Sequence, residues 1–292
     1  MPRLNLSNNL PPENYLRFYE IMNYPVPLNY ELYFQYDQND IAPKINDTDK
    51  KIINNKFSRE KKSEYMDEYL MEIKRLENVF KSIPFVEQIF LCNSISFNAL
   101  DNNSDIDLFI ISKPWRIRSV KFWSMLLFML KWAKRIWKNS RKKICLSFFV
   151  TSDNQNLYPI SLPSIDIYLA YRITHLVLIY QPDDSINNKI FSHNKWVQWI
   201  LPNYQEQQTI HLWIDPIHWN TKFKNICEKI WNWFLGDIFE QIVKIIQKII
   251  IRIKISKNPE LNKDVIISDS MLKFHQDLRE KISLKYNLKV KN

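Results

Sequence analysis

Glycine is nearly missing from this sequence. Gly236 is the single glycine among 292 residues, whereas an average usage of about 7% would give roughly twenty. A tight turn that needs a residue at positive φ must therefore use another side chain, and asparagine enters the left-handed region more readily than most. We predict that asparagines take the place of glycine in such turns. Lysine, asparagine and isoleucine are abundant throughout, as expected of AT-rich coding DNA, so lysine or isoleucine enrichment alone does not indicate a function.

Cysteine and histidine are few and scattered. The three cysteines, Cys92, Cys145 and Cys227, are odd in number and far apart, and the five histidines have no ligand spacing, which excludes a disulfide framework and a zinc-finger pattern. The first residues lack a basic-then-apolar signal sequence, and no stretch reaches the ~18 uninterrupted apolar residues of a spanning helix. With 46% hydrophobic and 25% charged residues, the composition is typical of a globular protein with a packed core. We expect a protein of a reducing cytoplasm.

Acidic residues are missing from positions 113–143, where eleven basic residues lie, in a chain of formal net charge +10. Such a field attracts polyanions: a triphosphate, a nucleic acid or an anionic membrane surface. A solvated helix face in a lysine-rich chain would give the same count. If the run forms a crossover helix between two strands, only its ends approach the sheet. We therefore expect Lys113, Arg116, Arg118 and residues 141–143 to border any cleft that the sheet forms with a polyanionic ligand, with the middle of the run in solvent.

Hydrophobic periodicity predicts the order of the elements. Apolar, β-prone runs predict strands at 85–92, 106–111 and 144–150. Apolar residues at three- and four-residue spacing predict helices at 15–22, 28–36, 58–82, 114–139, 166–180, 194–201, 223–255 and 269–286. The predicted fold class is α+β, with a small mixed sheet covered by one long helix. We expect an N-terminal helical region at 1–82, a core at 83–153 and a C-terminal helical region at 154–292.

The segment 223–255 combines an apolar stripe with a basic face. The stripe consists of Ile238, Ile242, Ile245, Ile246, Ile249, Ile250 and Ile253. We interpret it as the buried face of a core-packing helix, and we do not expect peripheral membrane contact. An alternative is a membrane-surface protein that uses 113–143 and 223–255 as amphipathic helices, because helix length does not separate the two cases.

The segment 90–111 contains the residues with the clearest chemistry. One predicted strand ends in Cys92-Asn93-Ser94, and the next begins with Asp105-Ile106-Asp107-Leu108. Successive strand side chains alternate faces, so Asp105 and Asp107 are expected on one side. Two close carboxylates repel each other unless a cation lies between them. Mg²⁺ (or Mn²⁺) is the expected cofactor, since Mg²⁺ takes one or two carboxylates together with substrate phosphate oxygens.

These two stretches resemble the signature of the DNA polymerase beta-like nucleotidyltransferases, in which Gly and then Gly or Ser precede an Asp-apolar-Asp-apolar pair by about ten residues. Here Asn93 stands in the glycine position. The resemblance implies that the core 83–153 is a nucleotidyltransferase domain. It also implies that Asn93, Ser94 and Ser104 bind the nucleotide, with Ser94 and nearby backbone N–H groups at a helix start on the β- and γ-phosphates. Asp105 and Asp107 would then be both metal ligands and catalytic residues.

Several other stretches resemble one group of bacterial nucleotidyltransferase-domain proteins of undefined substrate. They are Tyr24-Pro25-Val26-Pro27 with Glu31-Leu32, Cys145-Leu146-Ser147-Phe148-Phe149, Tyr168-Leu169-Ala170-Tyr171 and Met271-Leu272-Lys273-Phe274-His275 with Asp277 and Arg279. Within the last stretch, Lys273, His275 and Arg279 are candidates for substrate binding. Asn93 departs from the usual glycine and is predicted to adopt positive φ.

The sequence lacks the third carboxylate that active members of this superfamily usually have on a later strand. On the strand 144–150 the residue expected on the relevant face is Ser147, while Asp153 and Asp166 lie beyond that strand. The preferred function is nucleotidyl transfer from a nucleoside triphosphate to an unidentified hydroxyl, with a polyanionic acceptor such as nucleic acid as one candidate. The alternative is a nucleotide- or nucleic-acid-binding protein that has lost turnover. Trp115, Trp123, Trp132 and Trp137 along the basic helix would stack bases in that case, but we expect them to be buried against the sheet.

Overall fold

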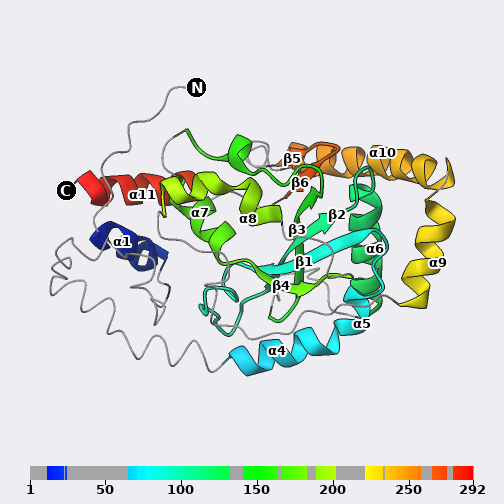
Figure 1. Cartoon of the computed structure of the whole chain (residues 1–292), viewed down its shortest axis with the longest axis horizontal. Coiled ribbons are helices and arrows are strands. Elements are labelled where there is room, and N and C mark those ends of the chain that lie inside the picture. The colour runs from blue at the N-terminus through cyan, green and yellow to red at the C-terminus, as the bar shows by residue number, and fades with distance from the viewer. Residues whose placement is uncertain are drawn as a thin grey trace.

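The structure is a computed structural model that describes residues 12–22, 24, 65–131, 141–163, 166–182, 189–201, 221–232, 234–257, 265–274 and 279–291. Every structural statement below concerns these residues. The fold is α+β, as predicted, with one six-stranded mixed sheet between helices (Figure 1). The helix predicted at 28–36 lies outside the described residues.

The sheet is built around the three strands predicted from the sequence. They are β1 (Val86–Cys92), β2 (Ile106–Ser112) and β3 (Ile144–Thr151). β1 and β2 pair antiparallel, whereas β2 and β3 pair parallel and are connected by α6 (Ile117–Leu130). The predicted crossover helix is therefore confirmed over 117–130, and residues 132–140 are outside the described part. The strand order is β4-β1-β2-β3-β6-β5.

Three further strands come from the segment 154–292, where we expected helices. β4 (Val177–Tyr180) follows α7 (Ile167–Thr174), so the helix predicted at 166–180 ends early. β5 (Ile266–Ile267) and β6 (Met271–Lys273) form a hairpin, and β6 lies within the predicted helix 269–286, of which α11 (Arg279–Lys291) is the described helical part. Strands of two to four residues are too short to show a distinctive periodicity. They form because a neighbouring strand is available to pair with them.

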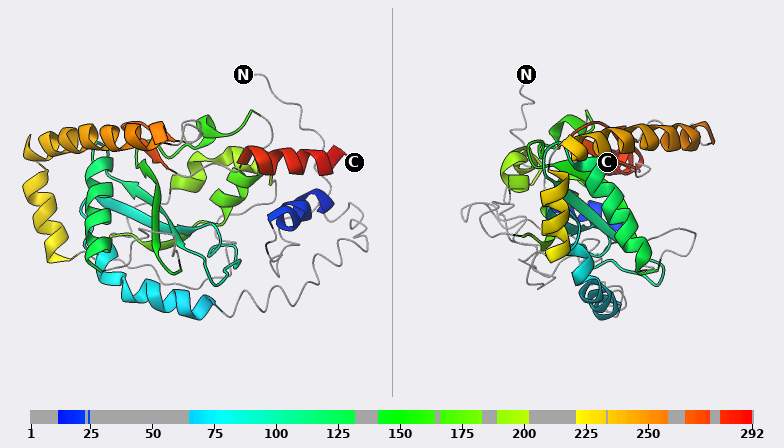
Figure 2. Two further views of the ribbon diagram at one scale, coloured as in Figure 1. Left: turned by 180° about the vertical axis from the view of Figure 1, so that it is seen from behind. Right: turned by 90° about the vertical axis from the view of Figure 1, so that its right-hand side faces the viewer.

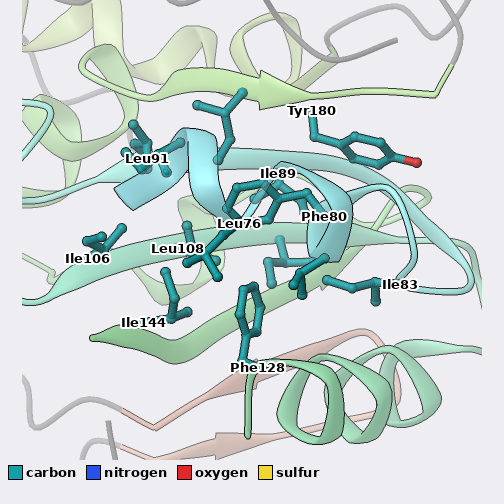
Figure 3. Close-up of a cluster of buried hydrophobic side chains, with 14 of the residues drawn as sticks. Leu76, Phe80, Ile83, Ile89, Leu91, Ile106, Leu108, Phe128, Ile144 and Tyr180 are labelled. Atoms are coloured by element: carbon teal, nitrogen blue, oxygen red, sulfur yellow. The ribbon is translucent and has the colours of Figure 1, made fainter. Parts of the chain in front are cut away.

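One face of the sheet is covered by α4 (Met66–Arg75), α5 (Glu77–Phe80) and α6. Met66, Tyr69 and Ile73 form the buried side of α4, at the spacing that predicted this helix. They contact a cluster of alternate strand residues (Figure 3), which includes Ile89, Leu91, Ile106, Leu108 and Ile144.

The other face is covered by α1 (Pro12–Met22), α7, α8 (Lys189–His193), the 3-10 helix η3 (Lys195–Trp199) and α11. A shorter 3-10 helix, η2 (Tyr158–Ile160), precedes α7. Phe18 of α1 stacks on Tyr171 of α7 with ring centroids 4.2 Å apart. The opposite strand residues, among them Phe90, Phe109 and Phe148, face this second layer. Asp107 points to the same side, because it lies two residues before Phe109 on β2.

The long helix predicted at 223–255 is two helices, α9 (Lys222–Trp231) and α10 (Phe234–Lys257), which meet at a corner on one edge of the molecule (Figure 2). The single glycine of the chain lies at this corner. A Cβ at Gly236 would be 1.7 Å from the carbonyl oxygen of Trp231, so a larger residue would force the helices apart. The φ of Gly236 is not positive. Glycine is therefore needed here for the close approach of the two helices and not for a left-handed turn.

The isoleucine stripe of α10 does not pack into a core. All seven isoleucines are between 41% and 60% exposed, so the prediction of a core-packing face is wrong. The helix is attached to α6 through its first turns instead: Glu240 accepts hydrogen bonds from the backbone N–H groups of Arg118 (2.7 Å) and Ser119 (2.8 Å). No helix in the described part of the chain combines the length and apolar character needed to cross a membrane.

Candidate metal and nucleotide site

The two aspartates lie where β2 begins, at the edge of the sheet where β1 ends and β3 starts. Asp107 is 6% exposed and Asp105 is half-buried. The ligand atoms of Asp105, Asp107 and Cys145 all lie within 4.8 Å of one another. The prediction that both carboxylates lie on one side and within reach of one cation is therefore confirmed. Cys145 joins them because it is the register partner of Asp107 on the parallel strand β3.

Asn93 has two roles at the end of β1. Its φ is 59°, which confirms the predicted left-handed conformation at the glycine position. Its side chain also donates a hydrogen bond from Nδ2 to Oδ2 of Asp107 (2.9 Å), and its Oδ1 accepts one from the Tyr168 hydroxyl (3.4 Å). A glycine would provide the turn alone, whereas asparagine also fixes the orientation of the carboxylate.

The loop after Asn93 consists of consecutive turns, so the helix start implied at Ser94 is replaced by a helix-like turn. The carbonyl of Asn93 accepts from the N–H of Phe97 (3.1 Å), and that of Ser94 accepts from Ala99 (2.8 Å). Asn98, with φ of 51°, is the second asparagine in the left-handed region. As in the first turn of a helix, the N–H groups of 94–96 precede the first bonded donor. Ser94 is half-buried, whereas Ile95 and Ser96 are buried, so Ser94 is the residue of this turn that an anion can approach.

Positive φ is not confined to asparagine in this chain. Among the described residues, Phe85, Trp115 and Lys142 also have φ between 55° and 63°. These side chains are bulky, so the conformation is unfavourable for them and must be held by surrounding contacts. The prediction that asparagine replaces glycine is confirmed at two turns, while three other turns use residues that the sequence did not indicate.

Ser104 belongs to the turn that leads into Asp105. Its hydroxyl donates to Oδ1 of Asp101 (3.0 Å) and accepts from the N–H of the same residue (2.9 Å). The Tyr69 hydroxyl donates to the Ser104 carbonyl (2.7 Å), which ties the turn to α4. In this conformation Ser104 supports the backbone before Asp105 and faces Asp101 rather than a nucleotide.

A set of buried polar groups surrounds Asp107 on the side of α7. Arg172 is 6% exposed; it donates to Sγ of Cys92 (3.6 Å), and its guanidinium lies 4.9 Å from the ring centroid of Phe148. Burial raises the pKa of the Cys92 thiol to about 12, which keeps it neutral at physiological pH. Burial, together with Tyr168 and the charge of Asp107, also raises the pKa of Tyr24. Arg172 and Tyr168 are one helical turn apart on α7, so they face the site together.

Two functional candidates were not found from the sequence. The position of Cys145 follows from strand register: if the second and third strands pair parallel from Ile106 and Ile144, the next residues, Asp107 and Cys145, are neighbours. The prediction from sequence placed Ser147 there instead. Ser147 lies two residues further along β3, at the irregularity between Leu146 and Phe148, and has no register partner on β2. Arg172 gave no signal, because a single arginine in an apolar helix is not distinctive.

The three substrate-binding candidates, Lys273, His275 and Arg279, do not share one position in the structure. Lys273 is 3% exposed and pairs with Phe148 across β3 and β6, which places it on the same sheet face as Asp107. Arg279 binds internally, with Nη1 2.8 Å from the carbonyl oxygen of Ile160 and 3.0 Å from Oδ2 of Asp166. That pair holds α11 to the N-terminus of α7. His275 lies outside the described residues.

Neither aspartate considered as a third carboxylate reaches the site. Asp166 caps α7, accepting from the N–H of Leu169 (3.0 Å), and is bound to Arg279. Asp153 is exposed and follows β3 at its far end. Within the described residues, the third ligand atom beside the two carboxylates is the sulfur of Cys145.

Most of the basic run lies away from the aspartates. From Asp107 the chain runs along β2 for ~17 Å to Ser112, at ~3.3 Å per residue. Lys113, Arg116 and Arg118 follow Ser112 and are therefore at the opposite end of the sheet. The prediction that these three border the cleft is wrong, because a crossover helix starts where its strand ends. They form ion pairs there: Lys113–Glu228 (2.7 Å), Arg116–Asp237 (2.5 Å) and Arg118–Asp269 (2.9 Å).

The other end of the run does lie near the aspartates. The carbonyl of Lys143 accepts from the N–H of Ile106 (2.9 Å), and the N–H of Lys142 donates to the carbonyl of Ser104 (3.0 Å). Glu68 forms ion pairs with Arg141 and Lys142. Of the tryptophans expected to be buried, Trp123 is partly buried in the core, Trp115 is 72% exposed, and Trp132 and Trp137 lie outside the described residues.

Comparison of the chain with protein-family models, curated proteins and solved structures finds no match. The site is therefore interpreted from its own residues and geometry.

Proposed function

We propose that the chain is a nucleotidyltransferase of the DNA polymerase beta-like type, which transfers a nucleoside monophosphate from a metal-bound triphosphate to an unidentified hydroxyl. The observation that supports this most directly is the juxtaposition of Asp105 and Asp107 with the left-handed turn at Asn93. The first provides ligands for a cation, and the second presents backbone N–H groups to an anion, so together they suit a metal-triphosphate complex.

In this proposal each described residue has a defined task. Asp105 and Asp107 bind the cation, Asn93 holds Asp107 in place, and Ser94 with the backbone N–H groups next to it binds the β- and γ-phosphates. The acceptor oxygen forms a bond to the α-phosphorus while the bond from that phosphorus to the β-phosphate oxygen breaks, and pyrophosphate leaves with the electron pair. The hydroxyl proton passes to a carboxylate oxygen or to water. The cation, when bound, would neutralise charge on the attacking and leaving oxygens.

The donor set fits a divalent cation but does not favour Mg²⁺ alone. Mg²⁺ prefers oxygen ligands, whereas a thiolate is a ligand for softer ions. Because Cys145 offers a sulfur beside the two carboxylates, we expect the site to bind Mn²⁺ better relative to Mg²⁺ than a site with three carboxylates would. Lys273 and Arg172, two buried cations on the same side of the sheet, would stabilise the bound phosphates.

A second function is favoured by one specific observation. The third carboxylate of active superfamily members ligates the catalytic metal and assists deprotonation of the acceptor, and here Cys145 lies beside the aspartate pair in its stead. The corresponding alternative is a protein that binds metal-nucleotide and has little or no turnover.

Incubation of the purified chain with each α-labelled nucleoside triphosphate, Mg²⁺ or Mn²⁺ and a cell lysate as the acceptor pool tests the proposal. Transfer of label by the wild type and by Asp153→Asn, with loss in Asp105→Asn/Asp107→Asn, is the expected result. Asp153 is the matched control, because it is an exposed aspartate at the far end of β3. Metal-dependent nucleotide binding without transfer would support the second function, and absence of both binding and transfer would contradict the two proposals together.

A further inference from the structure

The helices α9 and α10 expose many large apolar side chains at one edge of the molecule. Of the seventeen exposed large hydrophobic residues in the described part of the chain, ten lie on these two helices. Seven are the isoleucines of α10, and three are on α9: Phe223 (42%), Ile226 (58%) and Ile230 (54%). Single exposed apolar side chains are normal on a protein surface, whereas a series of them along one side of a helix, as on α10, marks an interaction site.

The apolar face is a regular feature of a firmly attached helix. At 100° per residue, the seven isoleucines of α10 occupy a sector of ~140°. The adjoining side of the helix holds it to α6: Val243 is buried, and Glu240 receives the N–H groups at the start of that helix. Gly236 fixes the corner that brings α9 alongside. The isoleucines are therefore exposed on a helix whose adjoining side is docked. Figure 2 shows α10 lying along one edge of the molecule, with α9 at its N-terminal end.

Beyond the first turns of α10, where Asp237 and Glu240 lie, the charges of this helix are of one sign. Between positions 241 and 257 the chain has five basic residues and no acidic one. Lys248 and Arg252 are exposed on the flank of the isoleucine sector, and Lys222 and Lys229 are exposed on α9. An isoleucine face flanked by lysine and arginine is the pattern of a helix that lies in the interface of a bilayer with anionic lipid.

We propose that α9 and α10 form a membrane-docking surface, which binds an anionic bilayer with the isoleucines at the boundary of headgroups and acyl chains and the basic residues at the lipid phosphates. A second copy of the chain is a poorer partner, because pairing two such faces would bring like charges together. A nucleic acid would contact the basic residues and leave the isoleucines in water. This surface is attached at the end of β2 remote from Asp105 and Asp107, so the proposal does not depend on the proposed transferase activity.

Co-sedimentation of the full chain with vesicles of phosphatidylcholine, with and without phosphatidylserine, tests this proposal at low and high salt. The wild type is expected to bind the phosphatidylserine vesicles at low salt and to be released as salt screens the charges. Ile249→Glu should weaken the apparent partition coefficient at least about tenfold. Leu284→Glu is the matched control: it changes an aliphatic residue of α11 that is 63% exposed, against 52% for Ile249, to the same acid. Its partition should stay within about twofold.

A second pair of variants tests the charges. Lys248→Glu/Arg252→Glu should weaken binding by about thirtyfold or more, since each basic residue near an anionic surface contributes about fivefold. Lys281→Glu/Lys285→Glu makes the same change in net charge at exposed positions on α11 and should have a small effect. Thermal melts establish that each variant is folded, as expected for substitutions at exposed positions.

Failure of the wild type to bind either vesicle, or equal binding by Ile249→Glu and Leu284→Glu, would overturn the proposal. Analytical ultracentrifugation adds a direct test of the rival partner. A wild-type dimer that becomes monomeric in Ile249→Glu would assign the face to a second copy and would equally overturn membrane docking.

Discussion

Replacing Cys145 with aspartate tests whether residue 145 belongs to the metal site. The ligand atoms of Asp105, Asp107 and Cys145 lie within 4.8 Å of one another, so a third carboxylate there would face two others. At that separation and an effective dielectric constant of about 20, each pair of charges repels by on the order of 3 kcal/mol. Partial protonation relieves some of this, and we expect Cys145→Asp without metal to be destabilised by about 1–3 kcal/mol.

A bound cation should reverse that loss. A ligand present at 100 times its Kd stabilises the folded state by about 2.7 kcal/mol, and in a chain of this size 1 kcal/mol moves Tm by about 2–4 °C. Thermal unfolding with EDTA, Mg²⁺ or Mn²⁺ measures both effects. We expect Mg²⁺ to raise the Tm of Cys145→Asp by several degrees more than that of the wild type. Cys145→Ser is the control: it removes the sulfur without adding charge, and should lose the wild-type preference for Mn²⁺.

Equal metal-induced shifts in the wild type, Cys145→Asp and Cys145→Ser would refute this reasoning, because residue 145 would then lie outside the ligand set. If the proposed function holds, Cys145→Asp should also transfer more label from the nucleotide than the wild type does. If Cys145→Asp has a higher affinity for Mg²⁺ but an unchanged transfer rate, residue 145 contributes to metal binding and not to the transfer step.

Three further predictions concern single residues. Asn93→Gly should fold and bind nucleotide more weakly, because it keeps the turn and loses the hydrogen bond to Asp107; Asn93→Val should lose a further ~1–2 kcal/mol of stability, and equal Tm values for the two would argue against a strained turn. Gly236→Ala should lower stability by about 1–3 kcal/mol, since the added Cβ meets the Trp231 carbonyl; an unaltered melt would show that the corner adapts. Burial lowers the pKa of Lys224 to about 8. Between pH 8 and about 10 the unfolded chain therefore binds more protons than the folded chain does. The free energy of unfolding should rise with pH over this range, by about 3 kcal/mol at most. This rise should disappear in Lys224→Met, whatever the change in overall stability; a rise of the same size in the variant would assign it to other groups.

Much of the site could be predicted because its determinants are local. The strands β1, β2 and β3 are apolar runs bounded by polar turns, and Asp105 and Asp107 share a face through strand alternation alone. The left-handed turn at Asn93 follows from the same local sequence, because few residues tolerate that conformation.

The features that could not be predicted depend on contacts between distant segments. Strands β4 and β6 are four and three residues long, and they exist because β1 and β3 offer edges to pair with. Cys145 becomes a candidate ligand through the register of β3 against β2. The isoleucine periodicity of α10 predicts an amphipathic helix correctly, but periodicity does not reveal whether protein, water or lipid lies against the apolar side.

The position of the basic helix relative to the aspartates also depends on contacts between distant segments. Its charge and length are evident in the sequence, whereas its contribution to a site depends on which end of β2 bears the aspartates. Arg116 and Arg118 start α6 at the far end of the strand, where Asp237 and Asp269 pair with them. A crossover helix begins at the carboxyl end of its strand, and the aspartates lie at the amino end of β2. These two arginines are therefore remote from the aspartates.

Equilibrium binding of a fluorescent nucleoside triphosphate, with and without Mn²⁺ or Mg²⁺, tests the central claim most directly. We predict metal-dependent binding by the wild type and by Asp153→Asn, and loss of that binding in Asp105→Asn/Asp107→Asn with little change in Tm, because relief of the repulsion between the two carboxylates offsets any lost contacts. Metal-dependent binding of equal affinity in the double variant would contradict the assignment of Asp105 and Asp107 as the ligands that position the nucleotide.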